Sequence, residues 1–228
     1  MIALALALAT ALQAAPAAGA PDVSDLPLVE VRSPKEGRRL AVVLTGDGGW
    51  ASRDKGLANA FSDAGVSVVG LSSPEYFSKR RTPDETAAAV ARIIEHYRAA
   101  WGRPETLLVG YSRGADIVPF VAGRLPPSAR EGLALVAMIG PGTFAEFQFH
   151  LIDLFRSVHR SDAVSTESAV RATGGACPML CIEGVDEKDS VCPRLLDLPW
   201  VRRVVLPGGH GFDNDFKEIA RIILDSAR

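Results

Sequence analysis

A serine and a histidine, each in a glycine-rich run, are the residues of this sequence whose types and spacing could do chemistry. Gly110-Tyr111-Ser112-Arg113-Gly114 fits the pattern G-x-S-x-G, and His210 follows two glycines in Pro207-Gly208-Gly209-His210. In such a pentapeptide the small end residues let a strand turn abruptly into a helix, which leaves the serine hydroxyl exposed. A nucleophilic serine needs a base, and histidine is the usual one. We therefore predict that Ser112 is a nucleophile and that His210 accepts its proton.

The base needs an acidic side chain to orient it, and a loop before His210 supplies three carboxylates. This loop, Gly184-Val185-Asp186-Glu187-Lys188-Asp189, follows a short apolar run. The chain order of serine, acid and histidine is then the one found in α/β-hydrolases. We expect Asp189 to be the acid, because Asp189-Ser190-Val191-Cys192-Pro193 resembles a D-x-x-V-P run that often follows the acid in that fold. Asp186 is the alternative.

A glycine-rich loop after an earlier apolar run is expected to complete the site. In Gly46-Asp47-Gly48-Gly49-Trp50, the backbone N–H of Asp47 would join that of Arg113 in an oxyanion hole. The loop is not a P-loop, because no Gly-Lys-Ser/Thr follows, and its glycines lack the spacing of a dinucleotide site. The pattern implies no metal and no organic cofactor.

Two acidic side chains, Asp47 and Asp116, flank the predicted nucleophile although a catalytic triad does not need them. A carboxylate at that place would orient a cationic acyl group, and we assign Asp47, Asp116 and Trp50 to substrate binding. The alternative is structural. Asp47 would then cap the following helix or brace the turn, and Asp116 would bond to neighbouring backbone.

The elements that must position these residues alternate between short strands and longer helices. Most of the expected strands are nearly continuous apolar runs, as strands covered on both faces must be. They are residues 29–32, 40–45, 66–71, 106–109, 134–139, 179–182 and 201–206. This alternation predicts an α/β fold in which a mostly parallel sheet carries helices on both faces.

The clearest helix signal lies between the third and fourth expected strands. Thr82 is a predicted N-cap, Pro83 suits the first helical position, and Glu85 stands in capping-box register. Further helices are expected over residues 52–64, 113–123 and 213–227. Residues 143–175 interrupt the alternation, because some of their apolar residues follow a strand period and others a helix period. A small cap or flap is expected there.

Length and composition indicate one soluble globular domain, which we place at residues 28–228. The chain has 228 residues, 47% of them hydrophobic, and a net charge of −2. Its longest basic run is Lys79-Arg80-Arg81, which argues against nucleic-acid binding. Residues 1–20 carry no charge and are predicted to be a signal peptide, with a disordered alanine-rich tail as the alternative. Residues 21–27 are expected to be flexible, and the mature protein to be exported.

The three cysteines lie close together near the predicted acid loop. In an oxidising compartment they suggest one disulfide and one spare thiol. We favour Cys181–Cys192 as the bridge, since the first cysteine would lie on a strand and the second at the end of the following loop. Cys177 is then left over. A zinc site is the competing interpretation, but it lacks a fourth ligand at any usual spacing.

Taken jointly, these motifs resemble the bacterial VirJ/AcvB virulence-protein domain family over about residues 40–225. The resemblance rests on Gly46 to Trp50, Arg81-Thr82-Pro83, Gly110 to Asp116 with Pro119-Phe120, Cys181 to Cys192, and Pro207 to His210 with Phe212-Asp213. Two positions differ from the family pattern. A second histidine would be expected where Gly211 stands, and a glycine where Asn214 stands.

The resemblance implies an exported α/β-hydrolase, and members of the AcvB type are associated with periplasmic hydrolysis of lysyl-phosphatidylglycerol and with virulence or type IV secretion. The leading interpretation is therefore a periplasmic serine esterase that cleaves the aminoacyl ester of a phospholipid, with secretion-system proteins as possible partners. One alternative is a general carboxylesterase or lipase. Another is a non-catalytic secretion-associated binding protein or chaperone.

Overall fold

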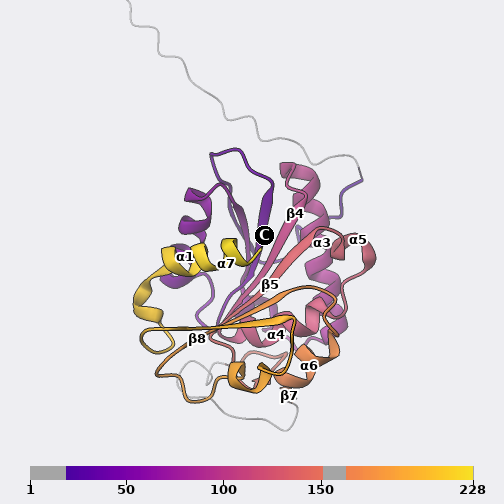
Figure 1. The fold of residues 1–228 in the computed structure, drawn as a ribbon. Helices are drawn as coiled ribbons and strands as arrows, with labels where there is room; N and C mark the ends of the chain where they lie inside the picture. The colour runs from indigo at the N-terminus through magenta and orange to yellow at the C-terminus, as the bar shows by residue number, and fades with distance from the viewer. Residues whose placement is uncertain (1–18, 151–162, 228) are drawn as a thin grey trace, which may run out of the picture.

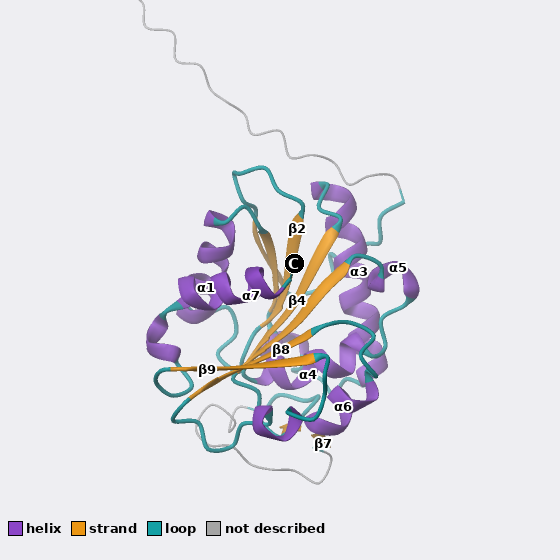
Figure 2. Ribbon diagram, in the orientation of Figure 1, coloured by secondary structure: helices purple, strands orange, loops and turns teal. Residues whose placement is uncertain are grey.

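Strands that are apolar on both faces form the centre of the molecule. The computed structural model describes residues 19–150 and 163–227. Its main sheet has seven strands in the order β1-β3-β2-β4-β5-β8-β9. The edge strand β1 pairs antiparallel with β3, and the other neighbours are parallel. Figure 2 shows these strands fanning out with the strong twist usual for an open sheet. The predicted α/β-hydrolase fold class is confirmed.

Each of the expected strands is present, with ends that differ by a few residues. The main sheet contains β1 (Leu28–Val31), β2 (Arg39–Leu44), β3 (Ser67–Leu71), β4 (Glu105–Tyr111), β5 (Leu133–Ile139), β8 (Met179–Gly184) and β9 (Val201–Leu206). A small antiparallel sheet of β6 (Phe144–Ala145) and β7 (Val164–Ser165) was not predicted, because two-residue strands leave no periodicity to detect.

Helices cover both faces of the sheet, as Figure 1 shows. The helices are α1 (Ser52–Asp63), α2 (Ser73–Tyr76), α3 (Pro83–Trp101), α4 (Arg113–Ala122), α5 (Pro127–Arg130), α6 (Thr166–Ala172) and α7 (Phe216–Ser226). Helices α1 and α7 contact each other on one face, while α3, α4 and α6 pack together on the other. Short 3₁₀ turns occur at Cys192–Leu195 and Phe212–Asn214.

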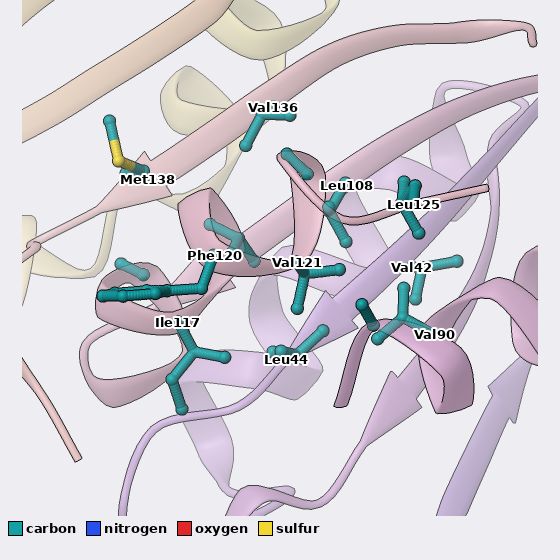
Figure 3. Packing of buried hydrophobic residues seen from close by; sticks show 14 of the residues in the cluster. Val42, Leu44, Val90, Leu108, Ile117, Phe120, Val121, Leu125, Val136 and Met138 are labelled. Carbon is teal, nitrogen blue, oxygen red and sulfur yellow. The ribbon is translucent and has the colours of Figure 1, made fainter. Parts of the chain in front are cut away.

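The core is split between the two faces by the alternation of side chains along each strand. On β2, Leu40, Val42 and Leu44 belong to the cluster beneath α3 and α4, whereas Ala41 and Val43 belong to the cluster beneath α1 and α7. Figure 3 shows the first cluster, in which α4 side chains lie among those of neighbouring strands and α3. Helix α4, which follows the predicted nucleophile, is therefore fixed by burial on its apolar side.

The N-terminal ends of α3 and α7 are set by residues that cap them. Thr82 accepts a hydrogen bond from the Glu85 N–H (3.1 Å), and Glu85 accepts one from the Thr82 N–H (2.7 Å), which confirms the predicted capping box. Helix α7 begins at Phe216 instead of residue 213, because Phe212, Asp213 and Asn214 have positive φ and Asp215 caps the helix.

Residues 21–27, expected to be flexible, have definite contacts in the structure. Val23 is buried, and Arg92 of α3 donates to the Asp22 carbonyl (2.9 Å) and forms an ion pair with Asp25. Most of the predicted signal peptide lies outside the described residues. In the part of the chain that the structure describes, no helix is both long enough and apolar enough to cross a membrane.

The segment at residues 143–175, which interrupts the alternation of strands and helices, begins with β6 and has no regular structure at residues 146–150. Phe149 N–H donates to the Phe77 carbonyl (2.8 Å), and Arg81 N–H donates to the Phe147 carbonyl (2.9 Å). The ring of Phe147 packs edge-on against Phe77 and Phe120. These long-range contacts hold residues 147–149 in place, but Phe147 and Gln148 form a bend, so neither the strand period nor the helix period gives a regular element there. Residues 151–162 lie outside the described ranges.

Candidate active site

The turn between β4 and α4 holds Ser112, which is half-buried, in a strained backbone conformation. Ser112 has φ +54° and ψ −121°, a conformation that residues with a side chain rarely adopt. The turn is tight enough to require glycine on either side. A Cβ at Gly110 would lie 2.2 Å from the Gly114 carbonyl oxygen, and one at Gly114 would lie 2.0 Å from the Leu44 carbonyl oxygen. The abrupt strand-to-helix turn expected from the pentapeptide is therefore present.

His210 lies between Ser112 and a carboxylate. Its Nε2 is 2.8 Å from Ser112 Oγ, and its Nδ1 is 2.6 Å from Glu187 Oε1. A carboxylate can only accept, so Nδ1 carries the proton, and Nε2 of the neutral ring accepts from the serine hydroxyl. This is the geometry of a nucleophile, a base and an orienting acid.

The acid in contact with His210 is Glu187, so the expectation of Asp189, with Asp186 as the alternative, is wrong. Gly184 N–H donates to Glu187 Oε2 (2.7 Å), and Glu187 N–H returns to the Gly184 carbonyl (3.0 Å). This turn directs the Glu187 side chain back towards His210 and leaves Asp186 and Asp189 exposed. The sequence shows that the loop has three carboxylates, but it does not show which of their side chains points towards His210.

The surroundings of Glu187 favour its charged form. Burial by itself would raise the pKa of the Glu187 carboxyl, but hydrogen bonds from His210 and from the Gly184 N–H hold that pKa below its usual value. The side chain is 12% exposed, so water competes little for its oxygens. Glu187 is therefore available as an anion across the neutral pH range.

The disulfide and a tight glycine support this arrangement. Cys181 and Cys192 are bridged, with Cα atoms 5.7 Å apart, and the bridge closes the loop that carries Glu187. The predicted pairing is confirmed, and Cys177 is a buried free thiol whose pKa burial raises to about 11. Gly140, at φ +61°, lies beneath the histidine, where an added Cβ would be 2.8 Å from His210 Cε1.

The glycine-rich loop after β2 lies against the nucleophile. A Cβ at Gly46 would be 3.1 Å from Ser112 Cβ, so the following residue, Asp47, is next to the serine. Arg113 opens α4, and the first N–H groups of a helix have no acceptor within it and favour negative charge. The oxyanion-hole role of the Asp47 and Arg113 amides stays a prediction.

The Arg113 side chain connects this loop to the segment after β6. Its Nε forms an ion pair with Asp47, and its Nη1 donates to the carbonyls of Glu146 (3.1 Å) and Gln148 (3.3 Å). The guanidinium also lies over the Phe149 ring, 5.9 Å from its centroid. The negative charge of Asp47 is thus compensated within the protein, which the sequence did not indicate.

The other predicted substrate-binding residues have different surroundings. Asp116 Oδ1 accepts the Gly142 N–H (2.6 Å), and burial raises the pKa of its carboxyl well above the usual value. Trp50 does not line the cavity at Ser112. Its ring packs over β3, where a Cβ at Gly70 would be 2.1 Å away. Trp50 therefore belongs to the core and not to the substrate site.

A cavity of about 390 Å³ opens beside Ser112. The residues that line it come from the loops described above, and many of them carry carboxylates. They are Asp47, Ser112, Arg113, Asp116, Gly140, Pro141, Gly142, Thr143, Phe144, Glu146, Glu187, Lys188, Asp189, Ser190 and His210. Over residues 19–150 and 163–227, no group of three His, Cys, Asp or Glu side chains could hold a metal ion.

The structure shows the surroundings of the two positions that differ from the expected family pattern. Asn214 has φ +60°, a conformation that asparagine tolerates better than most residues, so it takes the place of a glycine. An added Cβ at Gly211 would be 3.4 Å from an Arg53 nitrogen, so a larger residue would contact Arg53 and not Ser112.

Solved structures with hydrolase folds are similar to this chain. A proline iminopeptidase from Mycobacterium smegmatis aligns with a TM-score of 0.61 and 13% identity, over 91% of this chain and 97% of that chain. Est1E from Butyrivibrio proteoclasticus, with bound ferulic acid, gives 0.58 and 12%, over 90% and 95%. An alpha-beta serine hydrolase homologue from Coxiella burnetii gives 0.60 and 15%, over 87% and 89%.

At such low identities these likenesses show the fold alone. No curated protein matches the chain. The family described as bacterial virulence protein (VirJ) matches residues 38–228, and the chain belongs to that family.

Proposed function

We propose that this protein is an exported serine ester hydrolase that removes the aminoacyl group from an aminoacylated phospholipid such as lysyl-phosphatidylglycerol. The observation that carries the proposal is the hydrogen-bonded line from Ser112 through His210 to Glu187 beside a cavity rich in carboxylates. The line supports the reaction type, and the charge of the cavity supports the substrate class.

In the proposed reaction, Ser112 Oγ attacks the ester carbonyl while His210 Nε2 takes its proton. Glu187 holds the ring and stabilises the imidazolium that forms. The amides of Asp47 and Arg113 would bind the oxyanion of the tetrahedral intermediate. His210 then protonates the departing glycerol oxygen, and a water molecule activated by His210 releases the amino acid from Ser112.

The substrate class follows from the balance of charge around the nucleophile. Besides Glu187, the cavity is lined by Asp47, Asp116, Glu146 and Asp189, against the cations Arg113 and Lys188. An aminoacyl ester carries an ammonium group beside the scissile carbonyl, and a lysyl group carries a second one. The excess of carboxylates favours such a cationic acyl group over a neutral one.

Within this set, Asp116 is the better candidate for contact with an ammonium group. Asp47 already pairs with Arg113, whereas the hydrogen bond that Asp116 accepts comes from a neutral amide. Desolvation makes the negative charge of Asp116 costly. A bound cation would lower that cost and favour the ionised carboxylate.

The setting of the reaction is inferred from the family and the cysteines. A disulfide next to the site suits an oxidising compartment, and the resemblance to AcvB-type proteins implies the periplasm. The lipid substrate would be reached at the membrane surface. Secretion-system proteins are the partners that the resemblance implies, so a role in virulence or type IV secretion is part of the proposal.

The test is incubation of the purified mature protein with vesicles containing lysyl-phosphatidylglycerol, followed by lipid chromatography. We expect free lysine and phosphatidylglycerol from the wild type and neither from Ser112→Ala. A neutral p-nitrophenyl ester is assayed in parallel. Turnover of the neutral ester alone would indicate a general carboxylesterase, and no turnover of either substrate by folded protein would indicate a binding protein.

A further inference from the structure

The loop that carries the base is built mainly from residues without side chains. His210 is flanked by Gly208, Gly209 and Gly211, and Gly208 has φ +80°. Such a loop has little side-chain packing of its own, and glycine gives up more conformational freedom on ordering than other residues do. The positions of Nδ1 and Nε2 therefore depend on contacts made from outside the loop.

One such contact comes from the residue immediately before the nucleophile. The Tyr111 hydroxyl donates a hydrogen bond to the His210 backbone carbonyl (2.6 Å). The Tyr111 ring also lies edge-on to the His210 ring, with centroids 5.7 Å apart, and to the Phe212 ring at 6.3 Å. Tyr111 thus contacts the loop through both its hydroxyl and its ring.

Tyr111 is itself held rigidly. It is the last residue of β4, is 4% exposed, and belongs to the core cluster beneath α1 and α7. Burial raises the pKa of its hydroxyl to about 12, so the group remains a hydrogen-bond donor at neutral pH. A buried phenol on a central strand can therefore fix where the His210 loop lies relative to the sheet, in addition to the turn that Phe212 N–H closes on the Gly209 carbonyl (3.0 Å).

We propose that Tyr111 is a positioning residue for the base, whose hydroxyl ties the His210 loop to the strand that carries Ser112. This inference rests on the proposed function, because it concerns the base of that reaction. Tyr111 touches neither Ser112 Oγ nor the ring nitrogens in the proposed chemistry. It acts by fixing the His210 backbone, so that Nε2 stays within reach of the serine.

The variant Tyr111→Phe removes one hydroxyl and keeps the ring. We expect the rate of Ser112 labelling by a fluorophosphonate to fall about tenfold, because loss of one hydrogen bond can lower the fraction of molecules with His210 in place by about that factor. Substrate kcat should fall by a similar factor with KM unchanged, since the loop holds the base and not the substrate.

Tyr97→Phe is the matched control. Tyr97 is equally buried, on α3, and its hydroxyl donates to Glu30 (2.5 Å) on the opposite face of the sheet from the His210 loop. Both variants should lower stability towards urea by similar amounts, but only Tyr111→Phe should slow labelling. Labelling of folded Tyr111→Phe at the wild-type rate would overturn the inference.

A second readout separates this inference from the proposed function. The Nδ1 proton between His210 and Glu187 should give a downfield proton NMR signal whether or not the protein turns over any ester. We expect that signal to broaden or vanish in Tyr111→Phe and to persist in Tyr97→Phe. If the wild type is not labelled yet the signal behaves in this way, the proposed function fails and the positioning role stands. An unchanged signal in Tyr111→Phe would refute the positioning role.

Discussion

Glu187→Gln is the substitution that best tests which carboxylate orients His210: Glu187, as the structure indicates, or Asp189, as the sequence suggested. In the wild type, one oxygen of Glu187 accepts the Nδ1 proton of His210 and the other accepts the Gly184 N–H. A glutamine has one oxygen and one NH₂ group. If its oxygen faced His210, its NH₂ would face the Gly184 N–H, and two donors would oppose each other.

The glutamine is therefore expected to turn its oxygen to Gly184 and its NH₂ to His210. Nδ1 must then accept, so the ring proton moves to Nε2, which can no longer take the proton of Ser112. A wrong tautomer of this kind lowers kcat by about 10⁴ in a serine triad, or about 5 kcal/mol. The fold should persist, since the side chain keeps its volume and its bond to Gly184.

Steady-state kinetics on the lysyl lipid, or on a p-nitrophenyl ester, measure the effect, with circular dichroism as the check on folding. Asp189→Asn and Asp186→Asn are the matched controls from the same loop, and both should keep kcat within about tenfold of the wild type because neither contacts His210. Loss of activity in Asp189→Asn with near-normal activity in Glu187→Gln would refute the assignment of the acid.

Three further outcomes are expected. Asp116→Asn should reduce kcat/KM for the lysyl lipid at least about tenfold more than kcat/KM for a neutral p-nitrophenyl ester. Asp47→Asn should show a smaller difference between the two substrates. Equal losses on both esters in Asp116→Asn would make Asp116 a structural residue. Replacing Cys181 and Cys192 by serine should lower the free energy of unfolding by about 2–4 kcal/mol in urea titrations, as expected for a short bridged loop, and unchanged stability would contradict this. Asp54 is buried, its Oδ1 has no hydrogen-bond partner among the described residues, and burial raises its pKa from 3.8 to about 6. The folded state then holds this proton more tightly than the unfolded state, so stability falls as pH rises from about 4 to 6 and is lower by about 2–3 kcal/mol above that range. Asp54→Asn should therefore stabilise the protein at pH 8 but not at pH 4, and an equal effect at both values would count against this account.

Much of the fold could be predicted because strands buried on both faces leave continuous apolar runs in the sequence. The capping box at Thr82 and Glu85 was equally readable, since its partners are three residues apart. Ser112 and His210 could be singled out because the glycines around them signal tight turns. The turn at Ser112 leaves no room for a Cβ at Gly110 or Gly114.

The parts that the sequence did not reveal depend on the direction of side chains in three dimensions. Glu187 is one of three carboxylates in a short loop, and the turn closed on Gly184 decides which of them reaches His210. Trp50 ends the glycine-rich loop Gly46 to Trp50 that follows β2, yet its ring fills the space that Gly70 leaves on β3. The ion pair of Asp47 with Arg113 likewise joins residues far apart in the sequence.

The measurement that tests the central claim most directly is intact-mass analysis of the purified protein after reaction with a fluorophosphonate. The account predicts one adduct on the wild type, located on the peptide that contains Ser112, and no adduct on Ser112→Ala or on denatured protein. A folded wild type that takes up no label, or a Ser112→Ala variant that is labelled as fast as the wild type, would contradict it.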